Sequence, residues 1–167
     1  MTRFAPMPLE LDTERLELRL WRESDATWYR ELVPERGVDR PTREAAHAKV
    51  VELRANAFDT GIALLTIRRK DEGDHIGYCG LVVGRSNLDE PEIAYELLRE
   101  AHGRGYATEA ATAVLGAAIS TGRRRLWSTV RAWNAASFRV LEKIGFQRHH
   151  STWDDDGEIV WNVRDLP

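Results

Sequence analysis

A short β-type run, EIAYELL at residues 92–98, leads into two glycines, and an alanine-rich segment follows them. Apolar residues between Ala107 and Ala118 recur at helical spacing, which predicts a helix with one small, apolar face that ends near Gly122. The first N–H groups of a helix lack partners, and glycines before it remove the Cβ atoms that would block approach. The loop HGRG at 102–105 therefore predicts an anion site, and a pyrophosphate is the expected guest.

Other glycine loops that hold phosphates fit this segment less well. A P-loop needs a Lys and a Ser or Thr directly after its last glycine, and no such pair follows Gly103. A dinucleotide-binding loop needs a third glycine where Thr108 stands, and an acid in the next strand, 125–133, which has none. From these residues alone, a glycine turn that binds no ligand stays as the other interpretation.

The rest of the chain predicts one mixed α+β domain over residues 1–167. Alternating or β-rich runs predict strands at 15–21, 62–69, 75–84, 92–98, 125–133, 146–153 and 158–164. Helical spacing predicts helices at 23–33, 41–61, 107 to about 121, and 134–145. The expected N-caps of the first, second and last helices are Ser24 or Asp25, Thr42 and Asn134.

Composition narrows the class of partner. The 24 Lys and Arg against 27 Asp and Glu give a net charge of −3, so no basic surface for nucleic acid is expected. No 18-residue apolar stretch and no signal peptide is visible, which predicts a cytoplasmic protein without a membrane partner. The lone Cys79 is expected in the core, and no His, Cys, Asp or Glu spacing indicates a metal site.

Three blocks of the sequence, in order, resemble the GNAT superfamily of N-acetyltransferases. The glycine loop resembles its Q/R-x-x-G-x-G/A signature through His102, Gly103, Arg104, Gly105, Tyr106 and Ala107. His102 stands where Gln or Arg is usual. VRAWNAASFRVLEKIGF at 130–146 resembles the segment that follows in the family. TERLELRLWRESDA at 13–26 resembles the Rim-type branch, which includes acetylases of ribosomal-protein N-termini, so the resemblance runs from about Leu11 to the C-terminus.

The resemblance implies a mostly antiparallel central sheet flanked by helices, acetyl-CoA as co-substrate and an amine as acceptor, in a monomer or homodimer. It places the pyrophosphate on the loop amides from Arg104 to Thr108, where the Thr108 hydroxyl could add a hydrogen bond. The backbone amides around Leu97 and Leu98 would pair with the pantetheine arm, and one could polarise the thioester carbonyl. Asn134 would contact the coenzyme in addition to capping its helix.

The resemblance also suggests a proton donor for the departing thiolate. Many GNAT proteins use a tyrosine four residues before the Gly-Phe pair, but this sequence has Leu141 there. Ser137, in the first turn of the same helix, is the preferred substitute, and Tyr95 is a lesser option. An exposed early-helix serine without a catalytic role is the other interpretation of Ser137.

The acceptor amine must lose a proton to attack, so a general base is expected. Glu92 and Glu96 share one face of a strand because side chains alternate there, and Glu92 occupies the place where some GNAT enzymes carry a catalytic glutamate. Both could instead be structural acids, with a water chain doing the work. The acceptor is a protein α-amine or a small-molecule amine, and the alternative function is a non-catalytic acyl-CoA binding or sensing module.

Overall fold

Eight strands form one sheet, in the order β1-β2-β3-β4-β5-β6-β8-β7, in the computed structural model, which describes residues 3–167. The strands are β1 (Glu10–Asp12), β2 (Leu16–Arg19), β3 (Leu64–Arg69), β4 (His75–Val82), β5 (Glu92–Leu97), β6 (Arg125–Arg131), β7 (Gln147–Asp154) and β8 (Gly157–Asp165). The helices are α1 (Ala26–Leu32), α2 (Arg43–Thr60), α3 (Tyr106–Ser120) and α4 (Ala135–Lys143), with 3-10 turns η1 (Glu23–Asp25), η2 (Val33–Arg36) and η3 (Arg99–Ala101). Only β5 and β6 are parallel, so the predicted mixed, mostly antiparallel sheet is confirmed.

Most predicted elements lie where local signals put them. Thr42 caps α2 by accepting the Ala45 N–H at 3.0 Å, and Gly61 ends that helix with a φ of 74°. One prediction was wrong in detail, and one strand was missed. The expected helix at 23–33 is divided into η1, α1 and the start of η2, and the three-residue strand β1 carries too short a pattern to be recognised.

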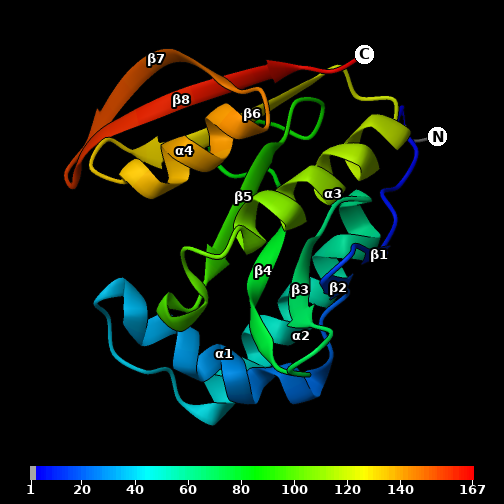
Figure 1. Cartoon of the computed structure of the whole chain (residues 1–167), viewed down its shortest axis with the longest axis vertical. Coiled ribbons are helices and arrows are strands. Elements are labelled where there is room, and N and C mark those ends of the chain that lie inside the picture. Colours follow the sequence, from blue (N-terminus) through cyan, green and yellow to red (C-terminus); the bar gives the residue numbers. More distant parts are fainter. Residues whose placement is uncertain (1–2) are drawn as a thin grey trace.

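The sheet opens between its two halves. β5 and β6 pair only at Glu92 and Trp127, whereas β5 pairs with β4 along its whole length. Beyond that point Ser128 Oγ donates to the Ile93 carbonyl at 3.1 Å, and the two strands then separate. Figure 1 shows β6, β8, β7 and α4 on one side of β5, and β1 to β4 with α1 and α2 on the other. One edge of β5 therefore stays without a strand partner over its second half.

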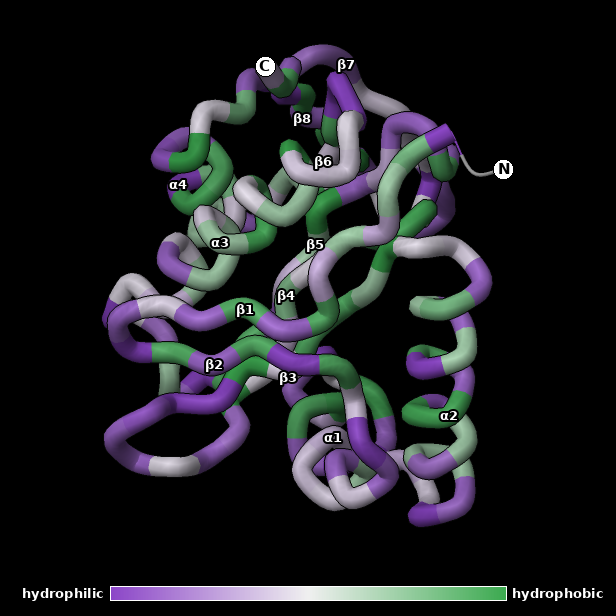
Figure 2. The backbone as a smooth tube through the Cα atoms, turned by 90° about the vertical axis from the view of Figure 1, so that its right-hand side faces the viewer, coloured by the Kyte–Doolittle hydropathy of each residue, from purple (hydrophilic) through white to green (hydrophobic). Residues whose placement is uncertain are grey.

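The helices cover opposite faces of the sheet. The predicted apolar face of α3 is confirmed, because Ala110, Ala111 and Val114 are fully buried against the main core, which also holds Cys79. Burial raises the pKa of the Cys79 thiol, as expected for an inert core residue. On the other face α1 packs against α2, whose turns alternate between hydrophobic and hydrophilic residues (Figure 2). Within residues 3–167, no helix has both the length and the apolar character that crossing a membrane requires.

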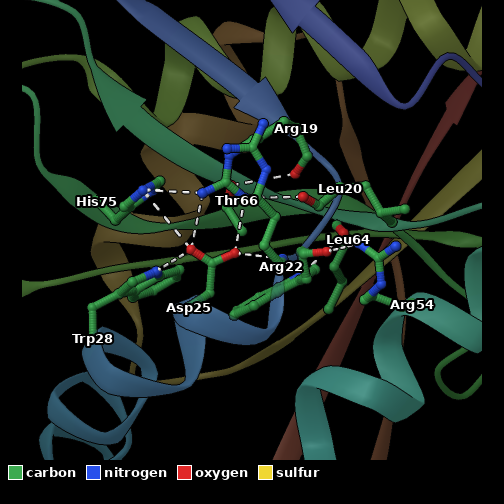
Figure 3. Close-up of polar contacts among 10 residues, drawn as sticks. Arg19, Leu20, Arg22, Asp25, Trp28, Arg54, Leu64, Thr66 and His75 are labelled. Atoms are coloured by element: carbon green, nitrogen blue, oxygen red, sulfur yellow. Dashed lines mark hydrogen bonds and ion pairs between the residues drawn. The ribbon is translucent and has the colours of Figure 1, made fainter. Parts of the chain in front are cut away.

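A buried polar cluster anchors the start of α1 to the sheet (Figure 3). The Asp25 carboxylate is 2% exposed and accepts two hydrogen bonds from the Arg19 guanidinium, at 2.8 and 3.0 Å. It also accepts the Arg22 N–H and the Trp28 indole N–H. Burial opposes its ionisation, but these donors outweigh burial and lower the pKa of Asp25. Arg19 also donates to His75 Nε2 at 3.1 Å, which ties β2 to the first residue of β4.

Candidate active site

The loop before α3 has the backbone that the glycines predict. Gly103 and Gly105 have φ values of 75° and 80°, a region that favours glycine, and Gly105 is the N-cap of α3. Thr42 and Asn134 cap α2 and α4 with their side chains, but no side chain among residues 3–167 caps α3. The first N–H groups of α3 are thus uncapped beside an exposed loop, at the positive end of the helix dipole.

A second set of contacts holds this loop in place from the N-terminal strands. Arg15 donates to the Arg104 carbonyl at 2.9 Å, and its guanidinium lies 4.4 Å from the centre of the Tyr106 ring. The Glu109 carboxylate, in the first turn of α3, accepts hydrogen bonds from the Thr13 hydroxyl and from the backbone and side chain of Arg15. These donors outweigh burial and lower the pKa of Glu109. The Glu109 charge near the helix start is therefore balanced by Arg15, and Glu72, which lies 3.8 Å from the Arg104 guanidinium, is also paired with Arg69.

The open edge of β5 leads from the sheet to this loop. The Leu98 N–H donates to the Ile76 carbonyl of the β4 side at 2.8 Å, so the predicted pairing of the Leu98 amide with a pantetheine arm is wrong. Because strand residues alternate in direction, the Leu97 N–H and C=O point the other way, toward the gap. His102 Nε2–H donates to that Leu97 carbonyl at 2.9 Å and ties the end of β5 to the loop.

The first turn of α4 faces the same gap. Asn134 Oδ1 accepts the Ser137 N–H at 3.2 Å, which confirms Asn134 as the N-cap. The Tyr95 hydroxyl donates to the Ser137 carbonyl at 3.0 Å, and burial raises the pKa of Tyr95. Ser137 Oγ is half-buried and makes no hydrogen bond with residues 3–167, which leaves it available to a ligand. Leu141 is buried in the core and offers no polar group.

The two candidate glutamates have different surroundings. Glu92 is 4% exposed, and its carboxylate accepts the Thr129 N–H at 3.0 Å and the Arg85 N–H at 2.5 Å. A Cβ atom on Gly84 would lie 1.6 Å from Glu92 Oε2, so the backbone approaches this carboxylate closely. Glu92 thus joins the β4–β5 loop to β6 at the point where the strands separate. The predicted role of Glu92 as a base does not fit this enclosed carboxylate.

Glu96 lies further along the same face and remains accessible. Its carboxylate binds the Arg36 guanidinium through contacts of 2.7 to 2.9 Å and accepts the Tyr78 hydroxyl at 2.7 Å. These hydrogen bonds raise the pKa of Arg36, while burial and the Glu96 charge raise the pKa of Tyr78. Arg36 and Tyr78 line a cavity of about 420 Å³ between α1, α2 and the sheet. Neither glutamate is among the residues that line this cavity, but Glu96 contacts two of them, Arg36 and Tyr78.

A family model described as the acetyltransferase (GNAT) domain matches residues 15–147. The chain belongs to the GNAT acetyltransferase family. YkkB of Bacillus subtilis, described as an uncharacterized protein, is 31% identical over an alignment 154 residues long that covers 85% of this chain and 86% of YkkB. An acetyltransferase structure from Agrobacterium tumefaciens shares 28% identity at a TM-score of 0.79 and covers 99% of both chains.

The same fold occurs in RimL, a ribosomal L7/L12 alpha-N-protein acetyltransferase solved with coenzyme A. RimL has 16% identity and a TM-score of 0.79, with 96% of this chain and 98% of that chain covered. No group of three or more His, Cys, Asp and Glu side chains in residues 3–167 is arranged to hold a metal ion.

Sequence reasoning missed several residues of this GNAT site. Arg15 and Glu109 brace the loop, and Arg36 and Tyr78 hold Glu96, but each pair is remote in sequence. Glu109 alone had a local signal, because it is an acid in the first turn of α3, where a negative charge interacts favourably with the helix dipole. Trp133, next to Asn134, is 78% exposed and is not part of the cavity lining.

Proposed function

We propose that this acetyltransferase moves the acetyl group of acetyl-CoA directly to a primary amine, either a protein N-terminal α-amine or a small-molecule amine. The observation that carries the proposal is the uncapped start of α3, which lies beside the open edge of β5. The loop suits a pyrophosphate, because nothing lies within 4 Å of a Cβ placed on Gly103 and the nearby Glu109 is paired. The amides from Arg104 to Thr108 would hold it.

Leu97 is the residue of β5 best placed to meet the pantetheine arm. Its N–H points into the gap, whereas the Leu98 N–H is used within the sheet. Because the Leu97 N–H is fixed in a strand, it would donate to the developing oxyanion without reorganisation. The Asn134 amide nitrogen, which has no hydrogen-bond partner among residues 3–167, and the Ser137 hydroxyl would contact the same arm from the start of α4.

We assign the two proton transfers to Glu96 and Ser137. Glu96 would accept the proton of the ammonium, and the neutral nitrogen would attack the acetyl carbon. As the new C–N bond forms and the C–S bond breaks, Ser137 would donate a proton to the departing thiolate. The attacking nitrogen would lose its second proton to water, and Ser137 would recover its proton from solvent. The products are the acetylated amide and the free thiol of coenzyme A. Glu92 contributes by fixing the separation of β5 and β6 rather than by handling a proton.

The test is thiol release from acetyl-CoA with a panel of primary amines, together with mass analysis of the products. Wild-type protein should release thiol in step with acetylated amine. Glu96→Gln and Ser137→Ala should each lower kcat by about 10²-fold or more while acetyl-CoA affinity stays within about twofold. Tight acetyl-CoA binding without thiol release from any amine would favour the non-catalytic module instead. Full activity in both variants would refute the assigned roles.

A further inference from the structure

Arg36 lines the cavity between α1, α2 and the sheet, and the ion pair that it forms with Glu96 is only partly satisfied. Arg36 uses Nε and Nη2 on the carboxylate, and Nη1 has no hydrogen-bond partner among residues 3–167. Glu96 Oε2 takes three donors, whereas Oε1 accepts only from Arg36 Nε at 2.8 Å and has lone pairs left. The side chains are 39% and 23% exposed, so a ligand can reach both. One donor, Arg36 Nη1, and one acceptor, Glu96 Oε1, thus keep unused hydrogen-bonding capacity within the same ion pair.

The pair is preset by contacts that do not depend on a ligand. Arg99 donates from its backbone N–H to the Glu35 carboxylate and from its guanidinium to the Glu35 carbonyl, both at 2.9 Å. These bonds hold η2 against the end of β5, so Arg36 keeps its place beside Glu96. The Tyr78 hydroxyl fixes the carboxylate from the β4 side. Because these charged side chains are already fixed, binding a ligand to them would cost little further conformational entropy.

The rest of the cavity shows which kind of amine fits. Leu64, Val82 and Val83 give it an apolar wall on the sheet side. Lys49 adds a second cation to Arg36, and Glu52 is the one acid in the lining. A polyamine or a lysine-rich segment would bring further positive charge against Arg36 and Lys49, which disfavours such acceptors.

We propose that the acceptor is a small zwitterion, an α-amino acid with an apolar side chain, whose ammonium binds Glu96 and whose carboxylate binds Arg36. This inference rests on the proposed function, since Glu96 is the base assigned there. The ligand's carboxylate would take the free Nη1 edge, its ammonium would take Oε1, and its side chain would lie on the apolar wall. Deprotonation by Glu96 then gives the attacking nitrogen while Arg36 keeps the substrate oriented.

The test compares L-leucine with L-leucinamide, which differ by the carboxylate alone, in wild-type protein and in Arg36→Gln. The amine of leucinamide is less basic, so the two acceptors differ in wild type as well. The informative quantity is therefore the ratio of kcat/KM for leucine to kcat/KM for leucinamide, compared between wild type and variant. Arg36→Gln should raise KM for leucine by about tenfold or more, because a charge-assisted pair is lost, and change KM for leucinamide less than about twofold. Arg36→Lys keeps the charge without the fork and should give an intermediate ratio.

The matched control is Arg40→Gln, because Arg40 pairs with Glu31 at the exposed surface outside the cavity. Arg40→Gln should leave kcat/KM unchanged for both leucine and leucinamide. If Arg36→Gln and Arg36→Lys lower kcat/KM equally for leucine and leucinamide, so that the ratio of the two values stays as in wild type, the zwitterion proposal is overturned. It is also overturned if other amines are acetylated while leucine is not. Thiol release from no amine at all would instead overturn the proposed function.

Discussion

Replacing Glu92 and Glu96 in turn separates the structural acid from the catalytic one. In Glu92→Gln the side-chain amide can accept one of the two backbone N–H groups, from Thr129 or Arg85, but its NH₂ then faces the other. Two bonds to a charged acceptor, each about 1.5–3 kcal/mol, become one neutral bond of about 1 kcal/mol and one unsatisfied N–H that costs about 1–3 kcal/mol. With the low end of each range, the expected loss of unfolding free energy is about 3 kcal/mol.

For a chain of this length, about 1 kcal/mol changes Tm by about 2–4 °C, so Glu92→Gln should melt about 6–12 °C below wild type. Glu96→Gln keeps a hydrogen-bond acceptor for Arg36 near the surface, so its Tm should fall by less than about 3 °C while kcat drops. Thermal unfolding by circular dichroism and thiol release below both transitions measure the two effects. A Glu92→Gln protein that melts with wild type but has lost turnover would refute this division of roles.

Three further changes test the loop, its link to β5 and the α1 anchor. Gly105→Ala forces a non-glycine residue into a φ of 80°, at a cost of about 1–2 kcal/mol, so calorimetry should show acetyl-CoA affinity reduced by about tenfold; an unchanged Kd would contradict the loop assignment. His102→Ala removes the bond to the Leu97 carbonyl and should raise the KM for acetyl-CoA, while His102→Gln, the more usual family residue, should restore it; equal kinetics in both variants would count against the link. Burial lowers the pKa of His75 in the folded protein, so on acidification the unfolded chain binds a proton at a higher pH than the folded one. The contribution of neutral His75 to the free energy of unfolding is therefore fully present above about pH 6.5 and is lost as the pH falls through the pKa of the folded state. Chemical denaturation between pH 7 and 5 should therefore show a smaller loss in His75→Gln than in wild type, and identical profiles would show that His75 is not the titrating group.

Local signals in the sequence predicted the elements that position the site. Thr42, Asn134, Gly61 and Gly145 mark helix ends because caps and left-handed glycines act within a few residues of the chain. The strand–loop–helix unit was predictable for the same reason, since the glycines at its centre need no distant partner to adopt their backbone conformation.

The assignment of roles within the site depends on distant contacts and was not predictable. The common face of Glu92 and Glu96 followed from strand alternation, but their different roles depend on Thr129 and Arg36, which are 37 and 60 residues away. The error at Leu98 has a similar origin, because the pairing of β5 with β4 decides which amides face the gap. The sequence contains no register signal for that pairing.

The most direct test of the account is calorimetric titration of the wild-type protein with acetyl-CoA, coenzyme A and NAD. If the uncapped start of α3 holds the pyrophosphate of a coenzyme whose arm lies along β5, acetyl-CoA and coenzyme A should bind saturably at one site per chain, and NAD should not bind. Absence of acetyl-CoA binding, or NAD binding of equal strength, would contradict the assignment of this loop and of the transfer chemistry built on it.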